Sequence, residues 1–563
     1  MQEHITHTLP PPANSPTELS PNQSKYLLLG LALATAMEFY TFESMNLVLP
    51  DITGSLGVSF DEASWILTVY SSFLFLGVPL SFWLAGHFGY KRFLIWNAAL
   101  FAMMSVGAAL SPALGIMLIF RAVEGLTGAG LTVWWLAGIF MIVPRENRGP
   151  SLVVASVRLY FASMAGLILS GFLTDRLSWR LICVPNMILA FAAIRLLKNN
   201  FPELPKADSL RLRHTDYQGL ILATIGFLSL QVILSRGHID DWFGSPHIRL
   251  LALISVTAII AFVYWERRPG NHFPLMDMSL LSNRYTLAAV FIGIFAGMIL
   301  SGSLFVLPEF LRLVDSQTHS ATQTGCLIAF YALAYAVLRP IMLKVISKIG
   351  PRKSTALAFC MLIVAMLLFY RCLTTSTPDA YFLLPLALYA GCLTTVLPAI
   401  GLGAVGKLDP GRQLDGLQIY LTFRQFGASL GVAFLTILLE RRETLHSSRL
   451  YEHLNAANET TSTALSSMSN FLYTNSGASP TGTRLMSVGL LARAGEQQVA
   501  TLSYADCFLF MAMIGGLAFC FIPLLPPFVA APKQAEQLLP SRIEKETPRT
   551  RREMYTQALH LGN

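Results

Sequence analysis

The sequence predicts an all-α membrane protein with fourteen membrane-spanning helices, and three observations support this prediction. Of the 563 residues, 54% are hydrophobic and only 13% are charged, whereas a soluble chain carries about 25% charged residues because its surface must be hydrated. The mean hydropathy is +0.55. The apolar residues form long blocks between short polar loops, and a helix needs roughly 20 apolar residues to cross the hydrocarbon layer of a membrane.

The two ends of the chain are polar. Residues 1–25 are rich in Pro, Ser and Thr and have no apolar core before a small-residue cleavage site. We therefore expect a disordered cytoplasmic tail rather than a signal peptide. Residues 529–563 contain many Lys and Arg side chains and are expected to form a basic cytoplasmic tail.

Fourteen apolar stretches between these tails are long enough to span a membrane. Six fall within residues 26–200 and predict an N-terminal six-helix bundle. Two fall within a linker, 201–280, and six fall within 281–528, which predicts a C-terminal six-helix bundle. In chain order, the expected spans are about 26–49, 63–85, 92–110, 114–143, 150–173, 180–197, 217–235, 248–265, 285–311, 323–346, 354–374, 381–405, 415–439 and 504–528.

The loops between the spans alternate in charge. The loop after the first span contains Asp51 and Asp61 but no Lys or Arg, whereas the next loop contains Lys91 and Arg92. Because Lys and Arg stay on the cytoplasmic side, we expect a multi-pass protein of the cell inner membrane with both termini in the cytoplasm. The net charge of +8 then reflects membrane topology rather than a nucleic-acid partner. Residues 441–503, rich in Ser, Thr and Asn, are expected to form a long outward-facing loop.

The sequence carries no signature of an enzyme or a metal site. Its seven cysteines form no C-x-x-C pair and are interpreted as small core residues. A phosphate-binding glycine loop, a zinc-spaced Cys/His cluster and a nucleophile elbow are all missing from the sequence. We therefore expect a protein that is not an enzyme and has no cofactor or metal, driven by an ion gradient rather than by ATP hydrolysis.

One short motif occurs twice. Residues 88–92 (Phe-Gly-Tyr-Lys-Arg), after the second span, resemble residues 349–353 (Ile-Gly-Pro-Arg-Lys), after the tenth. Many transporters are built from repeated halves with a binding site between them. We therefore single out Gly89, Lys91 and Arg92 as a cytoplasmic loop motif.

Further short motifs follow one another in a fixed order along the chain. They are Asn46 with Leu49-Pro50; Trp65 and Tyr70; Arg121-x-x-Glu124-Gly125; Pro144 with Arg148-Gly149; Gly166 and Gly171 with Trp179 and Asn186; Asp216-Tyr217-x-Gly219; Asp241-Trp242-Phe243; and Arg424-x-x-Gly427-x-Ser429-x-Gly431. In this order and at these spacings, the chain resembles the fourteen-span drug:proton antiporters of the major facilitator superfamily, of the EmrB/QacA type. The resemblance covers nearly the whole chain.

The resemblance implies a major-facilitator fold, in which two inserted helices separate two six-helix bundles. It also implies a multidrug exporter that couples efflux of lipophilic or amphipathic molecules to protons by alternating access. Arg121 would then govern the protonation of a carboxylate in the first span, and Gly166 and Gly171 would belong to a helix-packing motif. The chain departs from the family pattern at Thr41 and Gly86, where acidic residues are usual.

Charged side chains within the spans are candidate functional residues, because each costs roughly 2.5–3.5 kcal/mol near the bilayer centre. Glu38 lies near the middle of the first span, one helical turn before Thr41 and on the same face. A carboxyl group enclosed in a dry cavity can exchange a proton near neutral pH. We interpret Glu38 as the proton carrier; the alternative is a protonated glutamic acid that only ties helices together.

Two neighbouring pairs complete the predicted coupling site. Glu43 lies about 7.5 Å further along the helix axis, on a stripe shared with Asn46, and either lines the cavity or belongs to an outer gate. Arg121 and Glu124 are three residues apart, so they can pair along one helix face. The alternative for this second pair is a purely structural role.

Three arginines within the spans are predicted cavity residues or charge partners. Arg158 and Arg424 have no local acid and need partners from other helices; Glu38 or Glu43 is a candidate counter-ion for Arg158. Arg339 precedes a proline, so its alternative role is to satisfy the carbonyl groups that the proline frees.

A last pair lies near a membrane edge. Glu309 and Arg312 are one turn apart and are expected to form a solvated pair. Aromatic side chains such as Phe39 and Trp134 either line an apolar cavity or face lipid.

Three functions remain open from the sequence. They are broad efflux, narrower export of a siderophore or fatty acid on the same fold, and a membrane receptor or scaffold that transports nothing. Buried charges on several helices favour transport. The expected partners are a small-molecule substrate, protons and membrane lipid. The resemblance adds a periplasmic adaptor and an outer-membrane channel, for which residues 441–503 would be the docking surface.

Overall fold

In the computed structural model, helices joined by short loops make up the described residues. Every regular element there is an α-helix or a short 3-10 helix. Most of the two predicted tails and Pro144 lie outside the described residues. These residues are 20–525 except 144–147, 203–215, 238, 269–270, 272–273, 315–318, 404–407, 409–411, 454–457 and 477–478.

The first six helices pack into the N-terminal half. They are α1 (Pro21–Leu56), α2 (Phe60–Phe88), α3 (Tyr90–Leu110), α4 (Leu114–Ile142), α5 (Arg148–Arg176) and α6 (Cys183–Asn200). Helix α1 packs against α4, α5 and α6, and α2 packs against α4. Helix α1 begins several residues before the expected span because Ser20 and Gln23 cap it reciprocally, each side chain accepting the other's backbone N–H.

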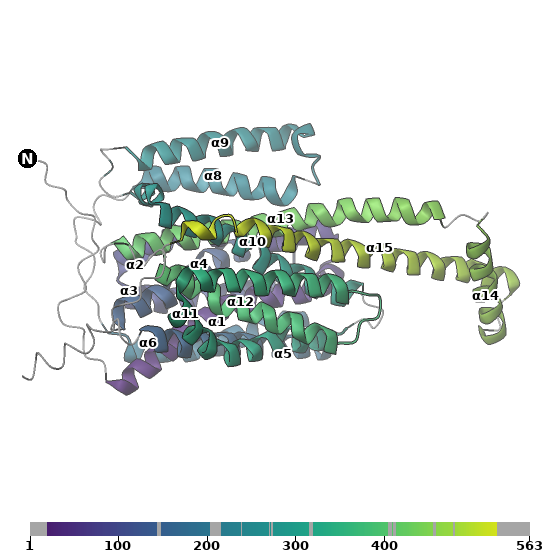
Figure 1. Ribbon diagram of the computed structural model, residues 1–563, viewed down its shortest axis with the longest axis horizontal. Coiled ribbons are helices and arrows are strands. Elements are labelled where there is room, and N and C mark those ends of the chain that lie inside the picture. Colours follow the sequence, from purple (N-terminus) through teal and green to yellow (C-terminus); the bar gives the residue numbers. More distant parts are fainter. Residues whose placement is uncertain are drawn as a thin grey trace, which may run out of the picture. The chain divides into compact units, whose positions relative to one another are not determined.

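The two inserted helices form a separate hairpin (Figure 1). Helices α8 (Tyr217–Arg236) and α9 (Pro246–Glu266) pack on each other, and α8 also contacts α2 and α13. The Asp216 carboxylate caps α8 by accepting from the Gly219 N–H at 2.7 Å, and it accepts from the Trp265 indole at 2.7 Å. One aspartate therefore joins the start of α8 to the end of α9.

The remaining helices form the C-terminal half. They are α10 (Arg284–Leu313), α11 (Ala321–Cys372), α12 (Ala380–Gly403), α13 (Gln413–His453), α14 (Glu459–Ser476) and α15 (Pro480–Ala518). Helix α11 is two helices joined at Gly350, whose φ of +80° is left-handed. Gly89, between α2 and α3, has a φ of +87°. Glycine adopts such angles without strain, so the motif that occurs twice has the same backbone turn in both halves.

The structure agrees with fourteen spans. Eleven described helices are long and apolar enough to cross a membrane. Helix α11 supplies two spans because Gly350 divides it. Helix α1, which carries Glu38 and Glu43, and the shorter apolar helix α12 complete the fourteen.

Residues 441–503 differ from the expected loop. Where they are described, they continue α13, form α14 and begin α15. Ser and Thr hydroxyls return to the helix backbone, as when Ser462 donates to the Glu459 carbonyl and Thr474 donates to the Asn470 carbonyl. Such bonds let a Ser/Thr-rich segment remain helical, which the composition alone does not reveal.

The two halves meet mainly along two pairs of helices, α5 with α11 and α2 with α13, and α1 and α4 make further contacts between them. A Cβ atom placed on Gly171 of α5 would lie 2.6 Å from the carbonyl oxygen of Ala321, at the start of α11. On Gly166 it would lie 2.9 Å from the ring of Tyr40 in α1. Gly171 therefore permits close contact between the halves, and Gly166 permits it within the N-terminal half.

Candidate functional site

Two cavities lie between the halves, and Phe42, Ser301 and Gln425 line both of them. The narrow cavity, which contains Glu38, has a volume of about 140 Å³ and is lined by α1, α2, α4, α5 and α10 to α13. The wide cavity, which contains Glu309, has a volume of about 630 Å³ and is lined by α1, α2, α8, α10, α13 and α15. The shared residues form the partition between them.

Glu38 lies in the narrow cavity and is only 6% exposed. The Thr132 hydroxyl of α4 donates to its Oε2 at 2.8 Å. A Cβ atom on Gly128, one turn earlier in α4, would lie 3.2 Å from the Glu38 Cγ, so the missing side chain makes room for the carboxylic acid. Thr132 was not among the predicted site residues.

Glu43 lines the same narrow cavity and is 4% exposed. Its carboxyl group faces the Tyr331 hydroxyl of α11, while its Oε2 has no hydrogen-bond partner among the described residues. Asn46, which was expected on the same stripe, lines the wide cavity instead. The structure therefore brings Glu43 together with Glu38 and separates both from Asn46.

Two arginines of the C-terminal half line the narrow cavity together with these carboxyl groups. Arg339 is buried, and it donates to the Ser156 hydroxyl of α5 at 3.2 Å and to the Thr394 carbonyl of α12. It therefore binds groups on neighbouring helices, not the carbonyls freed by the proline in its own helix. Arg424 of α13 lines the narrow cavity, and its charge acts on Glu38.

Arg121 and Glu124 form a fully buried ion pair behind the narrow cavity. The distance between Arg121 Nη1 and Glu124 Oε2 is 2.7 Å, and neither side chain is exposed. The Arg121 guanidinium lies 4.0 Å from the ring centroid of Tyr70. A Cβ atom on Gly128 would lie 3.0 Å from the Tyr70 hydroxyl and 3.2 Å from the Glu38 Cγ, so Tyr70 lies close to both the ion pair and Glu38. Tyr70 belongs to one of the sequence motifs, but its position relative to Arg121 and Glu38 can be seen only in the folded chain.

Two predicted cavity residues lie elsewhere. Thr41 accepts a hydrogen bond from the Asn186 side chain at 2.8 Å, and Asn186 also donates to Ser105 at 2.8 Å, all within the N-terminal half. Arg158 is half-buried and donates to the Lys25 carbonyl at 3.1 Å, near the start of α1. Its expected counter-ion is therefore replaced by a backbone oxygen, because its side chain reaches the end of the bundle.

The loop motif of Gly89, Lys91 and Arg92 also lies away from both cavities. Gly89 forms the turn between α2 and α3. Lys91 is half-buried and Arg92 is exposed at the start of α3, as expected for charges at a membrane boundary.

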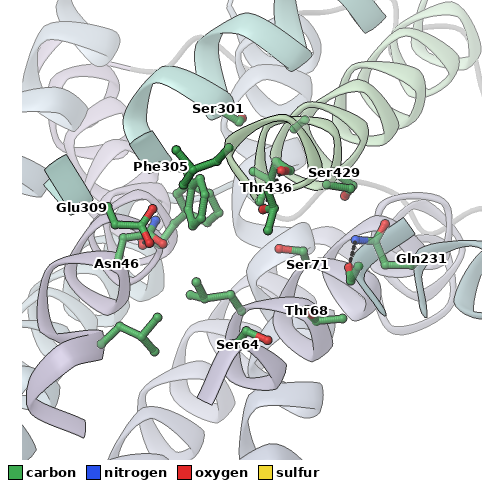
Figure 2. A pocket seen from close by; sticks show the side chains of 18 of the residues that line it. Asn46, Ser64, Thr68, Ser71, Gln231, Ser301, Phe305, Glu309, Ser429 and Thr436 are labelled. Atoms are coloured by element: carbon green, nitrogen blue, oxygen red, sulfur yellow. Dashed lines mark hydrogen bonds between the residues drawn. The ribbon is translucent and has the colours of Figure 1, made fainter. Parts of the chain in front are cut away.

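The wide cavity is lined by residues whose proximity was not predicted from the sequence (Figure 2). Glu309 lines it, but Arg312 does not form the expected pair with Glu309. Arg312 instead binds Asp51 of α1 at 2.7 Å and the Leu47 carbonyl. This ion pair links the two halves and leaves Glu309 facing the cavity.

Comparison with known proteins agrees with this architecture. The family model of the Major Facilitator Superfamily matches residues 31–432. The chain belongs to this superfamily. It is therefore a multi-pass membrane transporter and not an enzyme, as the sequence predicted.

Named relatives agree with the predicted EmrB/QacA type. The chain is 26% identical to the multidrug export protein EmrB of Escherichia coli, over 77% of this chain and 83% of that protein. It is 28% identical to EmrB of Haemophilus influenzae, over 79% of this chain and 87% of that protein. It is also 26% identical to the fatty acid resistance protein FarB of Neisseria gonorrhoeae, over 76% and 83%.

Solved structures support the fold alone. The POT family transporter PepTSo aligns with a TM-score of 0.55 at 12% identity, over 90% of this chain and 99% of that one. The proton:xylose symporter XylE aligns with a TM-score of 0.53 at 12% identity, over 87% and 95%.

Proposed function

We propose that this protein is a proton-coupled exporter of lipophilic or amphipathic small molecules, with Glu38 as the proton carrier. The observation that carries the proposal is the position of Glu38. It is buried in a cavity lined by both halves, bound to Thr132 of one half and acted on by Arg424 of the other. The printed names of the EmrB relatives support export of several compounds.

The coupling follows from the charges around Glu38. In alternating access the two halves rock about a fixed site, so Arg424 changes its distance from Glu38 as the cavity opens to each side. A nearby guanidinium favours the ionised carboxylate, and its withdrawal favours the protonated acid. Glu38 would therefore release its proton in one conformation and bind a proton in the other.

The orientation is part of the same proposal. The distribution of Lys and Arg favours an inner-membrane protein with both termini in the cytoplasm. The loop between α1 and α2 would then face outward. Asp51 and the wide cavity lie at the same end of the bundle and would also face outward. Tagging each terminus and testing its protease protection in sealed vesicles checks this orientation.

The function is tested with purified protein in liposomes under an imposed pH gradient. Wild-type protein is expected to accumulate a lipophilic dye against its concentration gradient. The Glu38→Gln variant should lose this accumulation and retain downhill dye exchange. The exposed Glu496 provides the control variant Glu496→Gln, which should behave as wild type. Gradient-driven accumulation by Glu38→Gln at the wild-type rate would refute the proposal.

The helical segment within residues 441–503 is the proposed docking surface for a periplasmic adaptor, which would lead to an outer-membrane channel. Its helices carry exposed apolar side chains, including Phe471 at 66% and Leu485 at 77% exposure. Replacing both residues by Ser should reduce export from cells without affecting transport in liposomes. Unchanged export from cells would count against an adaptor at this surface.

A further inference from the structure

We propose that the wide cavity is a binding site for a lipophilic organic cation, separate from the proton site in the narrow cavity. The inference deepens the proposed function, because it assumes that the protein moves small molecules and then specifies which class it binds, and where. It rests on the size of the cavity, on its charge and on its unpartnered polar groups.

Size separates the two cavities. Pockets for drug-sized ligands measure about 300–1,000 Å³, and the wide cavity, at about 630 Å³, lies within this range. The narrow cavity of about 140 Å³ holds about five water molecules at ~30 Å³ each. In this conformation only the wide cavity of the two can therefore accept an organic molecule.

Charge selects the class of ligand. Glu309, Glu440 and Glu443 line the wide cavity, and no Lys, Arg or His is present among its described lining residues. The charge of Glu443 acts on Glu309. Two basic residues near these carboxyl groups in sequence are engaged elsewhere, Arg312 with Asp51 at 2.7 Å and Arg442 with Asp506 at 3.5 Å. The described lining thus offers carboxyl groups and no basic side chain, which favours a cation over an anion as ligand.

Buried polar atoms of the wide cavity are available to bind a ligand. Ser429 is only 5% exposed, and its hydroxyl lines the cavity without a hydrogen-bond partner in the described part of the chain. The Oε2 atom of Glu309 is likewise buried and unpartnered there. Phe305 lies beside Glu309 (Figure 2), so an aromatic face adjoins the negative charge. An aromatic face next to a carboxylate suits an organic cation.

The inserted hairpin contributes one wall of this site. Gln231, Ser235 and Ile239 line the cavity, and the Gln231 amide donates to the Ser235 hydroxyl at 3.4 Å. Gln231 is 4% exposed and lies on the opposite side of the cavity from Glu309 (Figure 2). Helix α8 therefore presents polar groups to the part of a ligand farthest from its charge.

The test measures binding to purified full-length protein by equilibrium dialysis. Tetraphenylphosphonium is the cationic probe, and tetraphenylborate is an anion of nearly the same shape. Wild-type protein should bind the cation at least tenfold more tightly than the anion. Glu309→Gln should weaken cation binding about tenfold, and Glu309→Asp, which keeps the charge, should retain most of it. Ser71→Trp, which fills the cavity from α2, should block binding.

Control variants separate this inference from the proposed function. Glu452→Gln removes a carboxylate on the same helix as Glu443 but outside the cavity, and it should leave cation binding unchanged. Glu38→Gln should still bind the cation, with a modest loss of affinity because its neutral side chain mimics protonated Glu38, and should lose gradient-driven transport. If Glu38→Gln abolishes cation binding and Glu309→Gln does not, the ligand occupies the narrow cavity and this inference is overturned. If the wide cavity binds the cation but no pH gradient drives transport, the proposed function fails and this inference stands.

Discussion

The narrow and wide cavities share a partition but differ in the charged side chains that line them. In the narrow cavity, the carboxyl groups of Glu38 and Glu43 share the lining with the guanidinium groups of Arg339 and Arg424, and the charge of Arg424 acts on Glu38. In the wide cavity, three carboxyl groups have no basic residue among the described lining. A small site with guanidinium groups in its lining suits a group that must gain and lose a proton, whereas a larger site without a basic lining residue suits a mobile cation.

The largest expected effect lies behind the narrow cavity. Arg121→Leu leaves Glu124 buried without its partner, which should lower the free energy of unfolding by about 3–5 kcal/mol. Glu440→Gln removes an exposed carboxyl group from the wide cavity and should change it by about 0.5 kcal/mol or less. Denaturation in detergent compares the two variants. Equal losses would contradict the distinction between the buried ion pair and the exposed carboxyl group of the wide cavity.

A smaller effect is expected where the two halves touch. Gly171→Ala places a methyl group 2.6 Å from the Ala321 carbonyl oxygen, and such overpacking costs about 1–3 kcal/mol. Transport of dye into liposomes should therefore fall by about tenfold if the two halves must approach at this point. Gly516→Ala is the matched control, because a Cβ atom there meets nothing within 4 Å. Full activity of Gly171→Ala would show that this contact does not limit transport.

The smallest effect is expected at the ion pair between the halves. The side chains of Arg312 and Asp51 are 14% and 34% exposed, and partly solvated pairs contribute about 1 kcal/mol or less. Asp51→Asn should therefore shift the conformational equilibrium by no more than about fivefold. Cysteine labelling at Ser71 of the wide cavity reports this shift, once the exposed native cysteines are replaced. A much larger shift would identify the pair as the principal gate.

Much of the fold can be predicted from local patterns in the sequence. Spacing of apolar blocks predicts the spans, and the motif around Gly89 and Gly350 predicts the two halves, because both signals are local. The helicity of residues 441–503 was missed because Ser and Thr hydroxyls can bind either turns or the preceding helical turn, and composition does not distinguish these bonds.

The site was predicted only in part, for a related reason. Glu38 stands out because a charge within a span is costly. Nothing in the sequence distinguishes Thr132 and Gln231 from other polar residues. They line a cavity only because of how α4 and α8 pack. Arg158 binds a backbone carbonyl, where a carboxylate on another helix was expected. Arg312 binds Asp51, where Glu309 one turn away was expected.

The role of Glu38 is tested most directly by counting protons. Tetraphenylphosphonium is added to purified protein in weakly buffered detergent solution, and a pH indicator reports the protons released. The account predicts release from wild-type protein and none from Glu38→Gln, although this variant still binds the cation. Equal release from both proteins would mean that the proton comes from another group, and Glu38 would not be the carrier.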